Sequence, residues 1–597
     1  MGMRILSAVL FVLLVVVSHS HAATLAEAPP LGLWVGSAGD STSTVTLEIT
    51  PSDDGWTARV DDAPVNVRIN GDAIIISAPA DQSFTGTFNA EDGTIVGRWR
   101  QPMSRLGYSV METPVTLTEI DTQRWRAVID IQPRPYRVFL DVFDTASGVT
   151  AVIRNPARNE ILGATRFELI STGDKEWALT ASRRGRVTEV SLRQVDGDTL
   201  SLEHFRFREG IALSPAKTTD ARFYYSRLAE ESRRYTPPEA LDDGWSVVAA
   251  DEAGFDRDRL DALVAELANS DVRAERPRML HAMLVAHRGK LVFEEYFFGH
   301  TRETPHDTRS LAKVFGPILL GALRKTGADI SPNARPIPGV LKMAGETLDD
   351  PRKADITLAQ LMSFTSGLDC DAISGDSPGS EDNMWDQQEE PDFWRYTSRL
   401  PSLYPPGERY AYCSGSINLV GASLRETAGQ SIIDTFDQLI AKPLAFSAYH
   451  WNLAPNGAAY LGGGVYMKPR DILKLGAMYA AGGVWNDTRV LSEDWVREST
   501  TPVIDITPET TGLSEEAFNN NYFGGTQAYI WRGDAVRVGD KAYASYEATG
   551  NGGQIVLVVP ELDLAVVFTG GNYRMGYVWG RWRNQLVGEF VIPALLP

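Results

Sequence analysis

Residues 31–223 alternate apolar and polar side chains in short runs, and this alternation limits the fold of the chain more than any other feature. Residues 45–49 and 73–77 are two such runs, and the turn-forming segments 53–55 and 70–72 lie between them and their neighbours. Because successive side chains point to opposite faces of a strand, the pattern predicts antiparallel all-β structure. It does not distinguish a barrel from a sandwich.

A faint internal similarity divides this region. The residues that follow Trp56 resemble those that follow Gly148 in their order of apolar, glycine and acidic positions. Two similar β units fit this repeat. We therefore expect one β-rich domain at 25–120 and a second unit at 121–230, followed by a proline-containing linker at 231–244.

After residue 244 the pattern changes to mixed helix and strand. A chain of 597 residues is too long for one compact core, so a further domain is expected here. Helical periodicity occurs at 256–267, 310–324 and 577–590. Paired apolar runs typical of hairpins occur at 280–297 and 554–569. Together they predict that residues 245–597 form an α+β domain with an antiparallel sheet covered by helices.

The N-terminus has the features of a secretory signal. Arg4 precedes an apolar run of 13 residues at 5–17, and Ser20-His21-Ala22 forms a small-x-small cleavage pattern. The alternative is a membrane anchor, but a bilayer span needs about 20 apolar residues. We expect cleavage of residues 1–22, a periplasmic or secreted protein, and no membrane span in the mature chain.

Charge and cysteine content restrict the partners. The net charge is -20 with scattered Lys and Arg, so a nucleic acid is not an expected partner. The two cysteines, Cys370 and Cys413, could form a disulfide in an oxidising compartment or remain as buried thiols. No His-x-x-His or Cys-x-x-Cys spacing occurs, so neither a metal site nor a cofactor is predicted.

The strongest candidate nucleophile is Ser310 in Ser310-Leu-Ala-Lys313. A serine needs a base, and positions i and i+3 share a helix face, so the lysine amine can lie near the serine oxygen. The same pattern at Ser214 and Lys217 lies in the β-rich region without a following amphipathic helix, and we interpret it as chance.

The sequence offers two other possible nucleophile arrangements. Gly375-Asp-Ser377-Pro-Gly matches the nucleophile elbow of α/β-hydrolases, but its flanks are polar and lack the required strand and helix. A Ser-His-Asp triad would need a histidine in a supporting context. His306 precedes Ser310 by four residues and could line its site, but no histidine-centred constellation is visible.

From about Trp245 onward the chain resembles the serine β-lactamase and penicillin-binding-protein superfamily. It is most similar to the class C-like branch with esterases and 6-aminohexanoate-dimer hydrolases. The resemblance rests on ordered blocks at 310–313, 361–369, 406–414, 461–471 and 550–554. It implies a β-lactamase-like fold with a helical subdomain beside the sheet.

The resemblance also assigns roles to residues. Tyr412-Cys413-Ser414 matches the family's Tyr-x-Ser motif, which implies general acid/base chemistry for Tyr412. Ser414 would then face substrate or Lys313, and a Cys370–Cys413 bond would fix the Tyr412 loop.

The family's third motif departs from its pattern here. Asn551-Gly552-Gly553 stands where the family has Lys-Thr-Gly or His-x-Gly, so a side chain that could hold a penicillin-like carboxylate is replaced by a neutral one. The backbone N–H groups of Ser310 and Gln554 are the implied oxyanion hole, and small residues such as Gly553 would let substrate approach the strand.

These observations predict an exported serine hydrolase that cleaves a small ester, amide or peptide substrate through an acyl-enzyme. The alternatives are a β-lactamase or D-alanyl-D-alanine peptidase, and a non-catalytic penicillin-binding-like or envelope-binding protein. The sequence specifies neither the substrate nor the oligomeric state.

Overall fold

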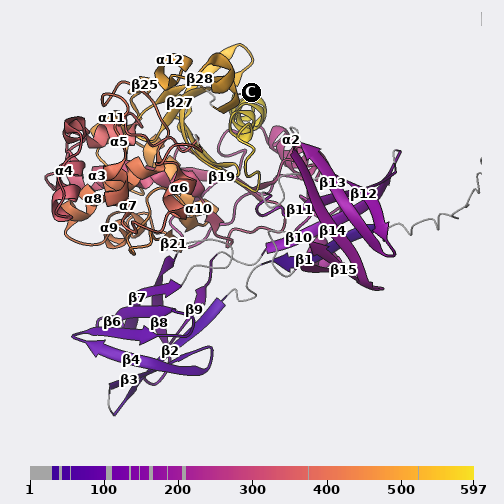
Figure 1. Ribbon diagram of the computed structural model, residues 1–597, viewed down its shortest axis with the longest axis horizontal. Coiled ribbons are helices and arrows are strands. Elements are labelled where there is room, and N and C mark those ends of the chain that lie inside the picture. The colour runs from indigo at the N-terminus through magenta and orange to yellow at the C-terminus, as the bar shows by residue number, and fades with distance from the viewer. Residues whose placement is uncertain are drawn as a thin grey trace, which may run out of the picture.

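Two β units and one α+β domain make up the computed structural model (Figure 1). The structure describes residues 30–38, 44–53, 55–101, 110–132, 136–146, 148–159, 166–183, 186–204, 210–373, 375–521 and 524–596. The signal peptide expected at 1–22 lies outside these residues. Within them, no helix combines the length and the apolar character needed to cross a membrane.

The first β unit is a closed barrel, at the right of Figure 1. Its strands, in barrel order, are β1 (Gly32–Ala38), β10 (Tyr136–Thr145), β11 (Gly148–Arg154), β12 (Arg166–Gly173), β13 (Glu176–Arg183), β14 (Arg186–Asp196), β15 (Thr199–Glu203) and β16 (Ile211–Pro215). Alternate side chains point inward, as in β15, where Leu200 and Leu202 are buried and their neighbours are more exposed.

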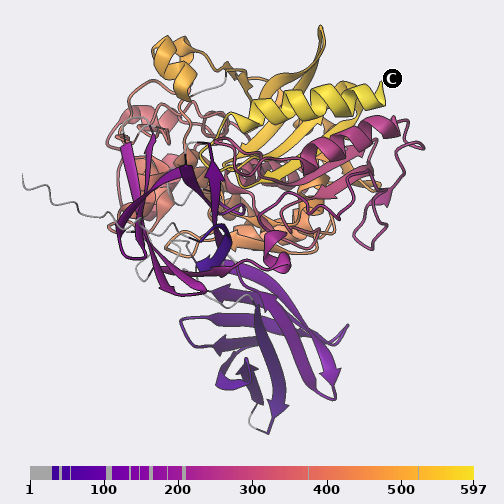
Figure 2. The same cartoon turned by 90° about the vertical axis from the view of Figure 1, so that its right-hand side faces the viewer.

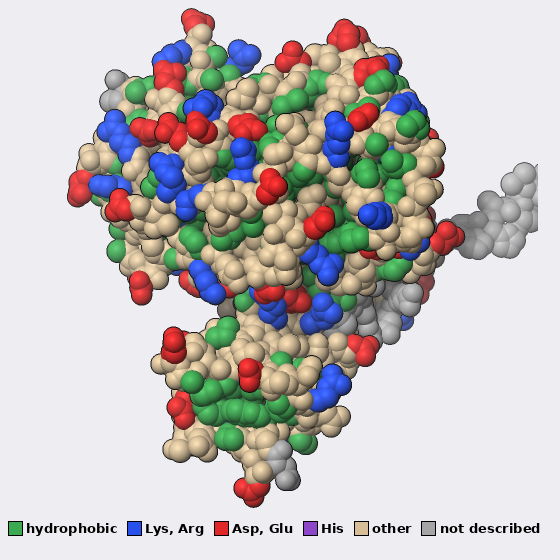
Figure 3. Space-filling model, turned by 90° about the vertical axis from the view of Figure 1, so that its left-hand side faces the viewer, with side chains coloured by type: hydrophobic (Ala, Val, Ile, Leu, Met, Phe, Trp, Pro, Cys, Tyr) green, Lys and Arg blue, Asp and Glu red, His purple; other side chains and the backbone are tan. Residues whose placement is uncertain are grey.

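The second β unit forms the lower lobe in Figures 1 and 3. Its strands are β2 (Thr44–Ser52), β3 (Gly55–Val60), β4 (Ala63–Asn70), β5 (Ala73–Ser77), β6 (Ser83–Asn89), β7 (Thr94–Gln101), β8 (Met111–Asp121) and β9 (Arg124–Asp130). Consecutive strands pair, and β9 pairs with both β2 and β8, so the pairing returns on itself. Barrels rather than sandwiches therefore account for the alternating pattern.

The strand pairing divides this region differently from the expected boundary at residue 120. That residue lies in β8, which pairs across the boundary with β9. Strand β1 pairs with β10 and β16, so it belongs to the second half of the region. Local alternation predicts strands, but partners that are about 100 residues apart leave no signal in it.

One strand of the lower lobe continues into the C-terminal domain. Strand β8 pairs with β21 (Tyr449–Asn452), β21 pairs with β22 (Tyr466–Met467), and β22 pairs with β20 (His306–Asp307). A hydrogen bond of 2.8 Å between Thr113 Oγ1 and His450 Nδ1 lies at the same join. The lobe is thus connected by strand pairing to the segment that leads to Ser310.

The linker at 231–244 is extended and packs against the domain that follows. Tyr235 is buried, and its hydroxyl donates to the Val292 carbonyl at 3.0 Å and accepts from Ala250 N at 2.9 Å. Upstream of it lies the short helix α1 (Thr218–Ala221). The segment therefore adds side chains to the core.

The C-terminal domain is built on a mixed, mainly antiparallel sheet. Its strands, in sheet order, are β17 (Ser246–Val247), β19 (Lys290–Tyr296), β18 (Leu280–His287), β30 (Leu564–Gly570), β29 (Gln554–Val559), β28 (Lys541–Gly550), β27 (Arg532–Val538), β26 (Thr526–Gln527) and β25 (Ile504–Asp505). A small hairpin, β23 (Val484–Trp485) with β24 (Thr488–Arg489), lies outside it. The two predicted hairpins, 280–297 and 554–569, are confirmed as β18–β19 and β29–β30.

Both faces of this sheet are buried. Along β29, Val556 and Val558 belong to one apolar core, whereas Ile555, Leu557 and Val559 belong to the other. Helix α2 (Arg257–Ala268) and the C-terminal helical segment 578–595 cover the second face, as Figure 2 shows. The predicted helices at 256–267 and 577–590 are confirmed. The α+β fold class is likewise confirmed.

The opposite face carries the helical part of the domain. Its helices are α3 (Phe315–Lys325), α4 (Pro336–Met343), α5 (Leu358–Met362), α6 (Glu381–Asp386), α7 (Phe393–Arg399), α8 (Ser414–Ala428), α9 (Ile432–Phe436), α10 (Pro469–Ala480), α11 (Glu493–Thr500), α12 (Pro508–Thr511) and α13 (Glu515–Asn521). The C-terminal segment comprises α14 (Val578–Arg581), the π-helical turns η5 (Trp582–Val591) and α15 (Ile592–Leu595).

Charged side chains of both signs are mixed over the face drawn in Figure 3, without a continuous basic area. A phosphate backbone would need clustered Lys and Arg side chains. The described residues on the face in Figure 3 form no such cluster, and the absence of a nucleic-acid partner stays a prediction from the net charge of -20.

Candidate active site

Ser310 lies in a 3-10 helix, η1 (Arg309–Val314), that leads directly into α3. The preceding residue, Arg309, has a φ of 50°, a left-handed conformation that is unfavourable for a side chain with a Cβ. Ser310 is partly exposed, while the rest of η1 from Leu311 to Val314 is buried. Non-glycine residues in such conformations cluster at functional sites.

Lys313 lies beside the candidate nucleophile. Its Nζ is 3.0 Å from Ser310 Oγ, and its side chain is fully buried. The same Nζ donates to the Gly462 carbonyl, whose own N–H donates to Asn418 Oδ1 at 3.1 Å. A backbone carbonyl from a second segment therefore holds the amine against the serine. The sequence predicts the serine–lysine pair, but not the carbonyl.

The carbonyl comes from a glycine segment, residues 462–464, which packs on the peptide before Ser310. Gly463 has a φ of +150°, and a Cβ placed there would lie 2.9 Å from the Arg309 carbonyl oxygen and 3.4 Å from Ser310 N. Gly464 N donates to the Arg309 carbonyl at 3.2 Å, and Thr308 N donates to Val465 O at 3.0 Å. The block at 461–471, to which no role was assigned from sequence, thus holds the backbone of the nucleophile.

The Tyr412 ring also lies near the Lys313 amine. The Lys313 Nζ is 5.0 Å from the centroid of the Tyr412 ring, which also contacts the Phe364 ring at 4.8 Å. Tyr412 is partly exposed. The Lys313 amine therefore lies near both Ser310 and Tyr412, although Tyr412 is about 100 residues away in the chain.

A disulfide joins Cys370 to Cys413, and the Cα atoms are 5.2 Å apart. It ties the loop after 361–369 to the residue that follows Tyr412. The Tyr412 carbonyl also accepts from Ala372 N at 2.7 Å. Of the two alternatives from sequence, disulfide or buried thiols, the structure has the disulfide.

Ser414 does not contact Lys313 in the interactions that the structure shows. It is fully buried at the start of α8, and its Oγ donates to Glu381 Oε2 at 3.3 Å. The Tyr460 hydroxyl donates to the other carboxylate oxygen, Glu381 Oε1, at 2.7 Å. Burial first, and then the neighbouring carboxylate, raise the pKa of Tyr460 well above its ordinary value, so this phenol stays protonated.

Glu381 is the first residue of α6 and lies within the segment 371–394, whose acidic residues have no recognisable pattern in the sequence. Its carboxylate links Ser414, of the Tyr-x-Ser motif, to Tyr460, which precedes the glycine segment. Sequence reasoning missed this residue because nothing local relates it to either partner.

Strand β28 packs against the segment that leads to Ser310. A Cβ on its last residue, Gly550, would lie 2.2 Å from the carbonyl oxygen of Thr308, two residues before Ser310. Asn551, Gly552 and Gly553 form the turn to β29, which begins at Gln554. Asn551 is therefore the first residue beyond the strand that contacts the nucleophile segment, and Gln554 lies across the turn.

The side chains of this turn brace the backbone. Gln554 Nε2 donates to Gly570 O at 2.7 Å, and Asn551 Oδ1 accepts from Arg574 N at 2.8 Å. Gly553 has a φ of +95°, and a Cβ there would lie 2.4 Å from the Trp582 ring. The packing of Trp582 thus requires a glycine at 553, while the role of this residue in substrate approach stays a prediction.

The alternative nucleophiles lie in unsuitable settings. Ser377 is buried in a loop, where its Oγ donates to Asp369 Oδ1 at 2.8 Å and accepts from Asp371 N at 3.0 Å. Ser214 is in strand β16 and Lys217 follows that strand, so they share no helix. Ser310 is therefore the candidate whose surroundings suit nucleophilic attack.

Comparison with known proteins gives an independent view. A curated relative, the 6-aminohexanoate-dimer hydrolase of Paenarthrobacter ureafaciens, is 26% identical over 249 residues, which are 40% of this chain and 61% of that protein. This chain therefore spans about three fifths of the length of that relative.

Solved structures also match. A putative 6-aminohexanoate-dimer hydrolase from Bacillus anthracis has a TM-score of 0.44 at 17% identity, covering 63% of this chain and 94% of that one. A family VIII carboxylesterase has a TM-score of 0.39 at 16% identity, covering 51% and 92%.

The family model described as Beta-lactamase matches residues 272–578, which is more than half of the 597 residues. The curated relative is named as a hydrolase. The matched range contains Ser310, Lys313 and Tyr412. The chain therefore belongs to the β-lactamase family.

Proposed function

We propose that this protein is an exported serine hydrolase that cleaves ester or amide bonds by forming an acyl-enzyme on Ser310. The observation that carries the proposal is the 3.0 Å distance between Ser310 Oγ and the Nζ of the buried Lys313, which the Gly462 carbonyl holds in place. A serine hydroxyl is a weak nucleophile unless an adjacent base takes its proton, and this amine is close enough to do so.

The first half of the reaction forms the acyl-enzyme. The Ser310 hydroxyl proton passes to the Lys313–Tyr412 pair as Oγ bonds to the substrate carbonyl carbon. The carbonyl π electrons move to the oxygen, which becomes a tetrahedral oxyanion. When the oxyanion collapses, the bond to the leaving group breaks, and Tyr412 gives that group the proton. In the second half, water attacks the carbonyl carbon of the acyl-enzyme ester and gives a proton to the Lys313–Tyr412 pair. The bond to Ser310 Oγ then breaks, and the pair returns a proton to Oγ, which restores the serine hydroxyl.

The oxyanion needs two hydrogen-bond donors. The N–H of Ser310 is one candidate. The N–H of Asn551 is the better second candidate, because Gly550 brings β28 against Thr308, whereas Gln554 starts the next strand. This replaces the pairing of Ser310 with Gln554 that the resemblance implied.

The neutral side chain of Asn551 favours esters and amides over penicillin-like substrates. Asn551 Oδ1 accepts from Arg574 N and offers no positive charge to a carboxylate. The curated relative is named as a hydrolase of a 6-aminohexanoate dimer, so short linear amides belong among the substrates to test. A β-lactamase or D-alanyl-D-alanine peptidase, and a non-catalytic binding protein, are the competing outcomes.

Export is part of the proposal. The pattern at 1–22 and the Cys370–Cys413 disulfide support a mature protein in the periplasm or the medium, since disulfides persist in oxidising compartments. Fractionation of the producing cells, followed by N-terminal sequencing, should give a mature chain that begins near Ala23. An intact Met1 on a cytoplasmic protein would contradict export.

Hydrolysis is tested with p-nitrophenyl esters, short amide oligomers and nitrocefin on the wild type, Ser310→Ala and the matched control Ser377→Ala. We expect Ser310→Ala to lose at least about 1,000-fold in kcat/KM on the best substrate, and Ser377→Ala to retain activity. Full activity in Ser310→Ala would refute the assignment of the nucleophile.

The same panel separates the competing functions. Nitrocefin hydrolysis that is faster than ester or amide cleavage would identify a β-lactamase instead. A fluorophosphonate probe should label the wild type but not Ser310→Ala. If the wild type reacted neither with the probe nor with any substrate, a non-catalytic binding protein would be favoured.

A further inference from the structure

Three histidines from separate segments of the C-terminal domain lie close together. His281 is in β18, His300 is in the loop after β19, and His306 is in β20. One nitrogen of each ring lies within 4.8 Å of the others. His281 Nδ1 is 2.7 Å from His306 Nε2, and the His281 and His300 rings stack with centroids 3.9 Å apart.

The hydrogen bond of His281 Nε2 shows which nitrogen of this ring carries the proton and which carries the lone pair. His281 Nε2 lies 2.7 Å from the carbonyl oxygen of Pro156, which can only accept a hydrogen bond. Nε2 therefore carries the proton in the neutral ring, and Nδ1 presents its lone pair to the cluster. A histidine that ligates through one nitrogen and donates from the other to a carbonyl is the usual arrangement at protein metal sites.

The His281 and His306 rings are buried and face each other, with 0% and 6% of their surface exposed. Because His281 Nδ1 accepts, His306 donates from Nε2 in the metal-free cluster. Binding of a metal ion through His306 Nε2 therefore moves that proton to Nδ1 of the same ring, and the neutral imidazole binds through its freed lone pair.

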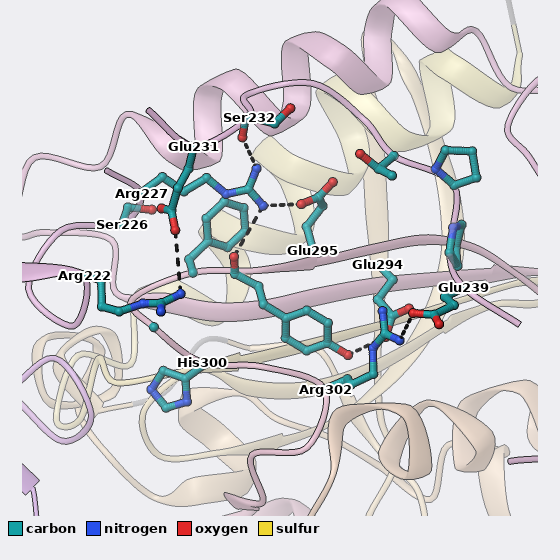
Figure 4. Close-up of a pocket in the computed structure, with 16 residues that line it drawn as sticks. Arg222, Ser226, Arg227, Glu231, Ser232, Glu239, Glu294, Glu295, His300 and Arg302 are labelled. Atoms are coloured by element: carbon teal, nitrogen blue, oxygen red, sulfur yellow. Dashed lines mark hydrogen bonds and ion pairs between the residues drawn. The ribbon is translucent and has the colours of Figure 1, made fainter. Parts of the chain in front are cut away.

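His300 connects the cluster to a cavity. It is half-buried and lines a cavity of about 420 Å³ that also borders Arg222, Arg227 and Glu295 (Figure 4). Of the three histidines, His300 is the one that lines this cavity. Ligation requires the His300 ring to turn out of its stack on His281, since an imidazole nitrogen binds a metal ion in the plane of its ring.

We propose that His281, His300 and His306 form a binding site for a divalent transition-metal ion, with Zn²⁺ as the best match. Three imidazole nitrogens and one open position suit a tetrahedral zinc ion. Nitrogens bound to such an ion lie about 3.4 Å apart at the usual bond lengths, so His281 and His306 would separate by less than about 1 Å.

The position of the site indicates a structural effect. The Pro156 carbonyl follows barrel strand β11, β18 is an inner strand of the C-terminal sheet, and β20 ends three residues before Ser310. An ion at the cluster would join the barrel to the strand that leads to the nucleophile. The spacing of 281, 300 and 306 has no recognisable metal-ligand pattern, so only the fold reveals the group.

The test is zinc titration by calorimetry on the metal-stripped, full mature chain, produced without a polyhistidine tag. We expect one equivalent of Zn²⁺ to bind the wild type. His300→Asn should weaken binding at least about tenfold, since loss of a ligand should cost no less than loss of a ligand's supporting partner. Because His300 is half-buried, this variant should remain folded, which circular dichroism checks; His306→Gln is the second variant.

Two controls make the outcome specific. His287→Asn removes a histidine at the far end of β18 that packs on Phe255, and it should bind zinc like the wild type. Ser310→Ala should also bind zinc normally, so the result is independent of the proposed hydrolysis. Co²⁺ in place of zinc should give the intense visible bands of a four-coordinate site in the wild type and lose them in His300→Asn.

The proposal is overturned if the wild type takes up no zinc. It is equally overturned if His300→Asn and His306→Gln bind as tightly as the wild type, or if His287→Asn weakens binding as much as they do.

Discussion

A Cβ atom on Gly463 would lie 2.9 Å from the carbonyl oxygen of Arg309, the residue before the candidate nucleophile. Arg309 is itself in a left-handed conformation, and Gly464 N holds its carbonyl. The glycine segment and the strained peptide therefore fit together as one unit, which fixes where Ser310 points.

We predict that Gly463→Ala lowers kcat about 100-fold, because a methyl group there must displace the Arg309–Ser310 peptide, and small displacements of reacting groups have effects of that size. The measurement is ester hydrolysis by protein that is shown to be folded. Gly482→Ala is the control: its φ is +61°, but its nearest neighbour is the flexible Glu493 side chain, at 3.6 Å. Equal losses of activity in the two variants would argue against a positioning role for Gly463.

Tyr412→Phe should lower kcat about 100- to 10,000-fold, because it removes the hydroxyl proposed to protonate the leaving group. The ring, and with it the contact to Phe364, is retained. Tyr410→Phe is the matched control, since Tyr410 packs against the same Phe364 ring from two residues away and is buried. The comparison is of kcat on one ester at several pH values. If Tyr412→Phe behaved like Tyr410→Phe, the general acid would have to be sought elsewhere.

The double variant Cys370→Ser/Cys413→Ser should lose about 2–4 kcal/mol of unfolding free energy, because the bond closes a loop across a separation of 43 residues. Serine is the suitable replacement, since Cys413 Sγ accepts from Ser416 N at the start of α8 and a serine hydroxyl can also cap a helix. Urea unfolding of both proteins, with and without a reducing agent, measures the change. Equal midpoints for the oxidised wild type and the double variant would contradict the prediction.

The sequence predicts those parts of the site that are close together in the chain. Ser310 and Lys313 are three residues apart, so any helical turn brings them onto one face, and the 3-10 turn found there does so as well as the expected α-helix. The helices and hairpins around the sheet could be predicted for the same reason. Their apolar periodicity is a local property.

Contacts between distant segments could not be predicted in this way. Gly462 holds Lys313 from about 150 residues away, and Glu381, at the start of α6, reaches Ser414 from a segment without a recognisable pattern. The turn after β28 shows how a small shift matters: Asn551 follows the strand on the nucleophile, while Gln554 begins the next strand. Which of them reaches the oxyanion depends on strand order, which a motif does not contain.

The histidine cluster should make the stability of the metal-free protein depend on pH near neutrality. The folded-state pKa values of His281 and His306 are lowered by burial, so the unfolded chain binds protons first as pH falls below about 6.5. Their contribution to stability is therefore fully present above that pH and is lost as the pH falls. The slope is up to about 1.4 kcal/mol per pH unit for each ring.

This slope can be measured by urea unfolding with EDTA at about pH 7.5, 6.5 and 5.5, spanning the ordinary histidine pKa. His306→Gln should have a shallower pH dependence than the wild type by up to about one ring's share. The carboxyls of Glu346 and Asp350, whose pKa values arginine side chains lower to about 2, act only below pH 4.5. Glu112 and Glu295, whose pKa values burial raises, are present in both proteins and cancel from the comparison. His287, whose pKa burial also lowers, contributes equally to both proteins and cancels from the comparison. Identical slopes in wild type and variant would mean that His306 is not the buried, uncharged ring that the structure places beside His281.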